Sequence, residues 1–208
     1  MRTTDALGEL QRLGRPVVSR SEAIARLGVR PARASQILKS LQEAGLVTRL
    51  GKGLWLVERE VDPFSLPPYL TSPYPSYVSM WSALSRHGMI EQIPRQVYVA
   101  SLDRPREINT PVALYSVHHL APEVFGGYAG TGDKGYVATP EKALFDTVYL
   151  RAARQGAIHL PELELPESFD PQELENWTER ITSQRLRTMV DRELGTLVGR
   201  SGQRTQSR

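Results

Sequence analysis

The sequence predicts an α+β fold in two domains, and three observations support this. Residues 19–57 read as a short helix, a turn, a second helix and a basic hairpin. Five prolines then crowd residues 61–75, where they exclude a regular helix or a central strand. Beyond them, segments of helical and strand character follow one another without an internal repeat. We therefore expect an N-terminal domain over residues 1–60, a semi-stiff linker or extended arm over 61–75 and a mixed α+β domain over 76–198. The aromatic residues Phe64, Tyr69 and Tyr74 indicate that part of the 61–75 segment packs on another part of the molecule.

The composition narrows the class of protein. The 208 residues are 40% hydrophobic and 24% charged, as in an ordinary globular chain. No apolar run is long enough to cross a membrane, and the first residues do not resemble a signal peptide, so we expect a cytoplasmic protein. The absence of cysteine excludes disulfides, thiolate metal sites and a cysteine nucleophile.

The charge is unevenly distributed along the chain. The formal net charge is +3, yet residues 1–60 hold eleven Lys and Arg against six Asp and Glu, a net +5, which leaves −2 for the remainder. A basic excess confined to one segment is the electrostatic footprint expected of a nucleic-acid-binding domain. Charge alone would equally suit a solvated basic surface.

The N-terminal segment contains clear helix boundaries. Leucines recur at helical spacing up to Gly14, which predicts a first helix, and an extended piece follows at residues 16–18. Ser19 and Glu22 have the spacing of a capping box, in which each side chain accepts a hydrogen bond from the other's backbone N–H. They start a helix that we expect to stop at Gly28.

A second helix and a hairpin complete this pattern. The helix is predicted over residues 31–44, with Pro31 in its first turn and Gly45 as its stop. Ala34, Ile37, Leu38 and Leu41 lie on one stripe of it. Strands at residues 46–50 and 54–57 flank Gly51-Lys52-Gly53, where glycines allow a tight turn. This order of elements predicts a winged helix-turn-helix.

A winged helix-turn-helix places one helix in the major groove of DNA. The polar side chains of the 31–44 helix suit that role, because Gln pairs with adenine and Arg with guanine. We therefore expect Arg33, Ser35 and Gln36 to read bases, and Lys39, Arg49 and Lys52 to bind phosphates. Arg30 adds to the same positive surface. Winged helices also serve as protein-interaction modules, which is the alternative.

The remaining segment predicts the elements of the second domain. Tyr77, Met80, Trp81 and Leu84 suggest a helix that ends at His87-Gly88. Strands are expected at residues 96–100, 113–118 and 136–138, with a glycine-rich hairpin tip at 126–135. Thr139-Pro140-Glu141 is a strong helix start. Two more helices are expected at 171–181 and 184–197, and the polar, basic residues 199–208 predict a disordered tail.

No pattern for catalysis or metal binding emerges. The sequence has neither a Gly-x-Ser-x-Gly motif nor a phosphate loop, and the glycine-rich run lacks the strand-loop-helix frame of a nucleotide fingerprint. His118 and His119 would point to opposite faces of a strand, so one metal could not easily use both. We expect structural histidines, no cofactor and no enzymatic activity.

Several segments of the chain resemble one family. Residues 79–94 resemble the segment of the AbiEi antitoxin family written "s-x-W-s-A-L-x-x-h-G-l-x-x-q-x-P", with Trp81 as its tryptophan. Val97-Tyr98-Val99-Ala100 matches the strand after it. The run 139–146 resembles the family's "t-p-E-k-a-l-x-D" helix start, and Gly53-Leu54-Trp55 agrees with its winged domain. The resemblance covers most of residues 4–150.

The resemblance implies a division of labour between the domains. In this family the winged domain binds inverted repeats in double-stranded DNA at the operon's own promoter and represses it. The second domain counters a nucleotidyltransferase-like toxin, the protein's functional partner, without needing a stable complex. Two alternatives remain: a ligand-responsive winged-helix regulator without a toxin partner, and an enzyme acting on nucleic acid or on the toxin.

Overall fold

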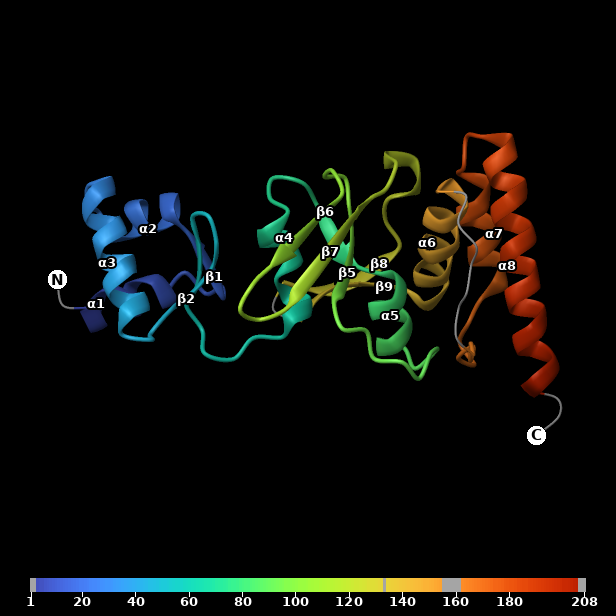
Figure 1. Ribbon diagram of the computed structural model, residues 1–208, viewed down its shortest axis with the longest axis horizontal. Coiled ribbons are helices and arrows are strands. Elements are labelled where there is room, and N and C mark those ends of the chain that lie inside the picture. The colour runs from blue at the N-terminus through green and yellow to red at the C-terminus, as the bar shows by residue number, and fades with distance from the viewer. Residues whose placement is uncertain (1–2, 133, 155–161, 206–208) are drawn as a thin grey trace.

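In the computed structural model, which describes residues 3–132, 134–154 and 162–205, two domains lie end to end (Figure 1). The winged domain occupies one end and the C-terminal helices the other. The N-terminal domain contains three helices and a small sheet: α1 Thr3–Gln11, β1 Val17–Ser19, α2 Arg20–Leu27, α3 Pro31–Glu43, β2 Thr48–Gly51 and β3 Leu54–Leu56.

The predicted winged helix-turn-helix is confirmed in its elements. Ser19 and Glu22 form the capping box at the start of α2, and Gly28 ends that helix in the left-handed conformation with φ 61°. The predicted apolar stripe of α3 is buried against α1 and α2. Strand β3 lies between β1 and β2 in an antiparallel sheet, so β2 is an edge strand.

The second domain is built on a six-stranded mixed sheet in the order β6-β7-β5-β4-β9-β8. The β4–β9 and β5–β7 pairs are parallel and the other pairs antiparallel. Its elements are η1 Pro63–Ser65, α4 Pro67–Leu70, β4 Ser76–Val78, α5 Met80–Arg86, β5 Val97–Ser101, β6 Arg106–Asn109, β7 Leu114–His119, η2 Pro122–Val124, β8 Tyr128–Thr131, β9 Gly135–Ala138, α6 Pro140–Ala153, α7 Pro171–Glu179 and α8 Gln184–Thr205.

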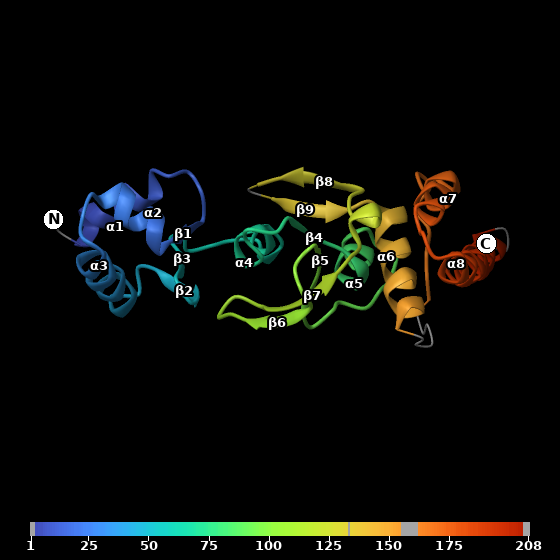
Figure 2. The ribbon, with the colours of Figure 1, turned by 90° about the horizontal axis from the view of Figure 1, so that it is seen from above.

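Alternate residues of the central strands enter two different cores. Tyr77 and Ala100 belong to the larger core, which includes α5 to α8. Val78, Val99 and Val117 point to the other face, into a cluster with α4. In Figure 2, α6 covers one end of the sheet and α7 and α8 lie beyond it. Both faces of the central strands are therefore buried.

The structure corrects the prediction that residues 61–75 contain no regular helix. The segment folds into η1 and α4, and Leu66 is fully buried. Tyr115 donates a hydrogen bond to the Pro63 carbonyl (3.0 Å). At Gly135, with φ +80°, an added Cβ would lie 2.1 Å from the Phe64 carbonyl oxygen, so η1 packs directly on β9. Pro63, Pro67 and Pro68 are compatible with this fold because they occupy first-turn positions, and Pro73 and Pro75 lie beyond α4 in no helix.

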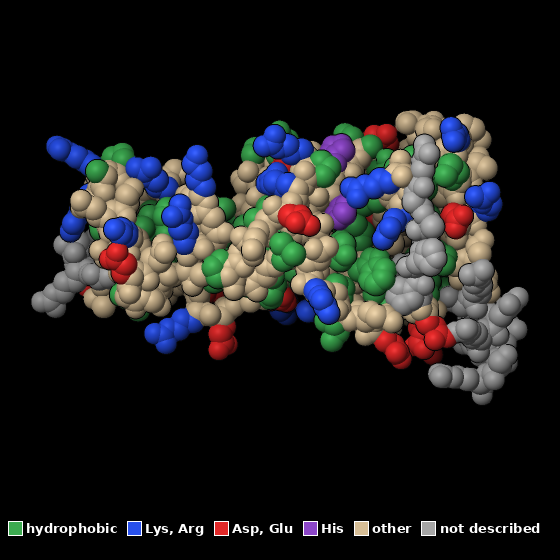
Figure 3. Space-filling view, in the orientation of Figure 1, with side chains coloured by type: hydrophobic (Ala, Val, Ile, Leu, Met, Phe, Trp, Pro, Cys, Tyr) green, Lys and Arg blue, Asp and Glu red, His purple; other side chains and the backbone are tan. Residues whose placement is uncertain are grey.

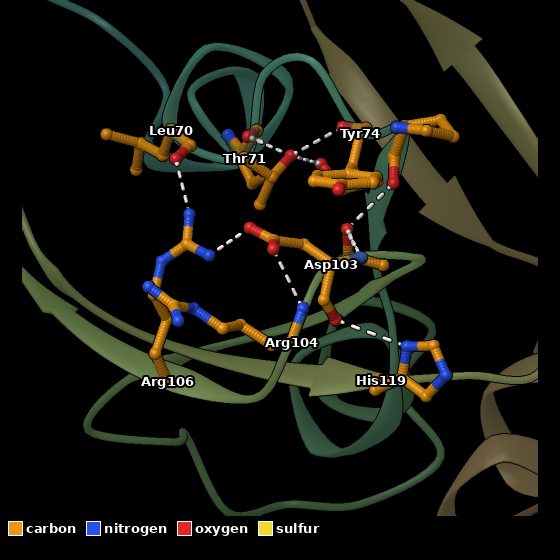
Figure 4. Close-up of polar contacts among 11 residues, drawn as sticks. Leu70, Thr71, Tyr74, Asp103, Arg104, Arg106 and His119 are labelled. Atoms are coloured by element: carbon orange, nitrogen blue, oxygen red, sulfur yellow. Dashed lines mark hydrogen bonds and ion pairs between the residues drawn. The ribbon is translucent and has the colours of Figure 1, made fainter.

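Polar contacts hold α4 to the edge of the sheet (Figure 4). The Arg106 guanidinium pairs with Asp103 and donates to the Leu70 carbonyl (3.1 Å). Burial alone would raise the pKa of Asp103, but the hydrogen bonds from Arg106 and from the Arg104 N–H outweigh it, and the pKa is lowered. The end of α4 is thereby fixed to the strands it covers.

A shared apolar cluster joins the two domains. Val17, Leu50 and Leu56 of the winged domain are buried in the same cluster as Leu66 and Leu70. Figures 1 and 2 both place α4 between the two sheets. The segment therefore contacts both domains and is more than a spacer.

Three further predictions about secondary structure are corrected. Tyr77 lies in β4 and not in the helix predicted around Trp81, because the run Ser76–Val78 is buried and pairs with β5 and β9.

Helix α8 continues to Thr205, where a disordered tail was predicted. Its sequence contains no proline, and it accommodates Gly199 at a cost of about 1 kcal/mol. Residues 206–208 of that tail lie outside the described part of the chain. Strands β6 and β8 were not predicted, since both are polar or glycine-containing edge strands.

Candidate nucleic-acid interface

Helix α3 presents most of the predicted base-reading side chains to solvent. Arg33 and Gln36 are exposed, one turn apart, and the Arg33 guanidinium lies 3.4 Å from the Gln36 side-chain oxygen. Ser35 is half-buried, and its hydroxyl donates to the Pro31 carbonyl (3.0 Å). Its hydrogen is thus used within the helix, and only its acceptor capacity is left for a base.

The predicted phosphate-binding residues are divided between α3 and the hairpin. Arg30 precedes α3 and Lys39 lies in its third turn, where it pairs with Glu43 at 3.6 Å. Arg49 lies on the edge strand β2, and its guanidinium donates to the Gly51 carbonyl (3.3 Å). Lys52 occupies the turn between β2 and β3, and its side chain is exposed. The exposed Lys39–Glu43 pair contributes little and leaves Lys39 able to bind a phosphate.

Ion pairing separates the basic residues of the winged domain into two groups. Arg12, Arg15 and Arg26 pair with Glu9 or Glu22. Within the described part of the chain, no ion pair is formed by the exposed residues at the start of α2, around α3 and in the hairpin: Arg20, Arg30, Arg33, Arg49 and Lys52. Arg59, which follows β3, is also exposed and forms no ion pair in the described ranges. Most of the available positive charge therefore lies on the elements that a winged helix uses to contact DNA.

Arg20 was not predicted from the sequence. It is the first residue of α2, where the helix dipole disfavours a cation, and its backbone N–H donates to the Gly53 carbonyl (2.9 Å). This bond places the start of α2 beside the Lys52 turn. The sequence could have identified Arg20 as a candidate DNA contact, because a cation at the first position of a helix is unfavourable for the helix itself. Figure 3 shows Lys and Arg side chains spread over the exposed surface of this domain.

The second domain contains a buried polar cluster that the sequence did not reveal. Lys142 and Asp146 are fully buried and form an ion pair one turn apart on α6. Ser79 and Tyr77 donate to the Asp146 carboxylate, at 2.6 and 3.1 Å. The Lys142 ammonium also lies 4.6 Å from the centre of the Trp177 ring.

Burial sets the protonation behaviour of this cluster. It lowers the pKa of Lys142 and raises the pKa of Asp146, and the contact between them opposes both shifts. Burial, and then the Asp146 carboxylate, raise the pKa of Tyr77. These side chains are enclosed within the fold, so removal of either member of the pair would leave the other as an unpaired buried charge.

The described histidines have structural partners. His87 ends α5, as its sequence predicted, with its Nε2 atom 2.7 Å from the Ala138 carbonyl oxygen. His119 lies 3.3 Å from the Asp103 carbonyl oxygen. His159 is outside the described residues. Among the side chains that the structure describes, no group of three His, Asp or Glu is placed to hold a metal ion.

The fold and the unpaired cations together define a winged-helix domain of the kind found in DNA-binding transcriptional regulators. The sequence model of the MarR family matches residues 2–52, which run from α1 through α3 to the Lys52 turn. No curated protein matches the chain in sequence. No helix in the described ranges has the length and apolar character of a membrane span. The family match supports a DNA-binding regulator, and it does not extend to the second domain.

Proposed function

We propose that this protein is a sequence-specific transcriptional repressor that binds inverted repeats in its own promoter, in the cytoplasm, and thereby excludes RNA polymerase. The observation that carries the proposal is the set of exposed, unpaired cations around α3 and the hairpin. Phosphate contacts from this set would fix the position of α3, while Arg33 and Gln36 would read base edges. The proposal assigns the protein no catalytic role.

Binding to the promoter tests this proposal directly. Fluorescence anisotropy with a duplex from the upstream region should show salt-dependent binding that a scrambled duplex of equal length does not match. The Arg30→Ala/Arg33→Ala double variant should lose most of the affinity. The control is Arg185→Ala/Arg192→Ala, which removes two exposed cations from α8 at the opposite end of the molecule. Equal losses in both variants would show nonspecific attraction only.

Gln36→Ala separates base reading from general affinity. If Gln36 pairs with an adenine, discrimination against single-base operator variants at that position should fall by about 1–3 kcal/mol, with little change for scrambled DNA. A competition titration over a set of operator variants measures this. Unaltered discrimination at every position would remove Gln36 from the base-reading residues.

We also propose that the second domain counteracts a nucleotidyltransferase-like toxin without forming a stable complex with it. The proposal is supported by the AbiEi-like segments around Trp81 and from Thr139, which lie far apart in sequence. In the fold they become α5 and the start of α6, which share one core. The two AbiEi-like segments are therefore neighbours in the fold, and a single surface of the second domain could use both of them.

Co-expression with the neighbouring gene tests this second proposal. If that gene encodes such a toxin, the full chain should restore growth. The Arg30→Ala/Arg33→Ala variant should restore it equally when expressed from an unrelated promoter. If Arg30→Ala/Arg33→Ala, which is impaired in DNA binding, failed to restore growth, protection from the toxin would depend on repression. That result would contradict a role for the second domain.

A further inference from the structure

A pocket of about 250 Å³ opens beside the helix-covered face of the second sheet. Its walls come from α5, α6, β5 and β7, so it lies away from the winged domain. The lining residues with polar or aromatic groups are Trp81, Tyr98, His118, Thr147, Arg151 and Arg154. Neither the DNA interface nor the buried Lys142–Asp146 pair uses this pocket.

Flat rings form one side of the pocket. Tyr98 and His118 lie on neighbouring strands, with ring centres 5.9 Å apart and planes 23° from parallel. Trp81 contributes a third, half-buried ring from the first turn of α5. Aromatic side chains in this arrangement provide a surface on which a planar ligand can stack.

Two arginines give the pocket its charge. Arg151 and Arg154 lie one turn apart near the end of α6, both are exposed, and no carboxylate lines the pocket. Within the described ranges, neither arginine forms an ion pair; the Arg154 guanidinium lies 3.5 Å from His118 Nδ1. Two guanidinium groups one turn apart in one pocket, with no carboxylate among the described lining residues, offer paired donors of the kind that bind a phosphate.

His118 is a neutral hydrogen-bonding group at physiological pH. Burial, followed by Arg154 and Arg151, lowers its pKa to about 4. Its Nε2 atom lies 3.0 Å from the Ser116 hydroxyl. The imidazole therefore adds no positive charge beside the two arginines, and its ring stays available for stacking.

Two further features point to a ligand. Met80, at the base of the pocket, has φ 52°, a left-handed conformation that is uncommon outside glycine and occurs preferentially at functional sites. The Thr147 hydroxyl donates to the Ala143 carbonyl (2.7 Å), which leaves it an acceptor for a ligand N–H or O–H. The pocket thus combines a stacking surface, an acceptor and an anion site.

We propose that this pocket binds a nucleoside monophosphate, with its phosphate on Arg151 and Arg154 and its base against Trp81 and Tyr98. The volume of about 250 Å³ lies just below the usual range for small-ligand pockets, so the site would hold one small ligand that is partly open to solvent at the exposed arginines. The same chemistry is offered by a free mononucleotide and by the phosphorylated end of a short strand. The proposal concerns the second domain alone and stands whether or not the winged domain binds DNA.

Calorimetric titration of the full chain tests the proposal. AMP and CMP should bind saturably. At least one of them should bind about 10-fold more tightly than its nucleoside or inorganic phosphate, because the base and the phosphate of the nucleotide contribute to binding together. A 5′-phosphorylated trinucleotide forms the comparison arm: tighter binding than the monomer identifies a strand end, and weaker binding identifies the free nucleotide. Equal affinities for phosphate and nucleotide, or no saturable nucleotide binding, would overturn the proposal.

Matched variants locate the binding in the pocket. Arg151→Gln/Arg154→Gln should abolish nucleotide binding, and Arg185→Gln/Arg192→Gln should leave it intact. Trp81→Phe should retain binding that Trp81→Ala loses. Circular dichroism of each variant verifies folding, and nucleotide binding that survives in a folded Arg151→Gln/Arg154→Gln protein would overturn the assignment.

Discussion

The cations around α3 and the hairpin and the buried Lys142–Asp146 pair use charge in opposite ways. In the winged domain Arg20, Arg30, Arg33, Arg49 and Lys52 are exposed, form no ion pair among the described residues, and lie at the start of α2, around α3 and in the hairpin. In the second domain, Lys142 is fully buried, is paired with Asp146 and is enclosed by aromatic rings. The first arrangement keeps its charge available to a partner, whereas the second uses its charge within the fold. Substitutions of the exposed cations around α3 and in the hairpin should therefore change DNA affinity, whereas substitutions at the Lys142–Asp146 pair should change the free energy of unfolding.

The largest effect is expected at the buried pair. Asp146→Ala leaves the Lys142 ammonium without a carboxylate in a closed site, so the free energy of unfolding should fall by about 3–5 kcal/mol. Urea denaturation measures the change. Asp191→Ala, which removes an exposed carboxylate from α8, is the control and should change stability by less than about 0.5 kcal/mol. Similar values for the two variants would contradict the assignment of Lys142–Asp146 as a buried pair whose members depend on each other.

A second large effect is expected at the junction. Leu66 is fully buried in the cluster shared by both domains, so Leu66→Ala should cost about 2–5 kcal/mol. Ile93→Ala is the matched control, because Ile93 is 87% exposed. Thermal unfolding of the three proteins measures the difference. If Leu66→Ala were as mild as the control, residues 61–75 would behave as the linker that their prolines first suggested.

A smaller, pH-dependent effect is expected at His118. Its pKa is about 4 in the folded protein against about 6.5 in the unfolded chain. Below about pH 6.5 the unfolded state therefore binds more protons, and stability falls as the pH drops towards 4. In His118→Gln, the stability lost between pH 7 and pH 4.5 should be smaller by up to about 2.4 kcal/mol, the value for full retention of the pKa shift. His119→Gln, at the exposed neighbouring position, should retain the wild-type loss.

The smallest effect is expected at the hairpin. Lys52→Ala removes one phosphate contact, so affinity for all duplexes should fall a few-fold and the salt dependence of log K should decrease by about one unit. Arg185→Ala on α8 is the control. A salt dependence unchanged by Lys52→Ala would contradict contact between the hairpin and the DNA backbone.

Features set by local sequence could be predicted. The capping box at Ser19, the glycine stop at Gly28, the buried stripe of α3 and the cap at Thr139 all appear in the structure. Each depends on residues a few positions apart, where spacing and chemistry determine the geometry. The exposure of the predicted DNA-binding residues other than the half-buried Ser35 follows from the same local pattern.

Features that depend on distant residues could not be predicted. The Lys142–Asp146 pair is visible as an i, i+4 spacing, but its burial depends on Tyr77 and Trp177 from other elements. Tyr77 itself was assigned to a helix, since its neighbours in β5 and β9 are not apparent from the run around it. The proline-rich segment was misassigned for a related reason, because prolines indicate where a helix starts without showing what it packs against.

The shared apolar cluster has a consequence for anyone who wishes to move the winged domain to another protein. A fragment cut at residue 60 would leave Val17, Leu50 and Leu56 on an open surface, where they would favour aggregation. A chimera that carried residues 61–71 as well would keep Leu66 and Leu70 as their cover. The unit that can be transplanted thus extends beyond the boundary at which the DNA-binding motif ends.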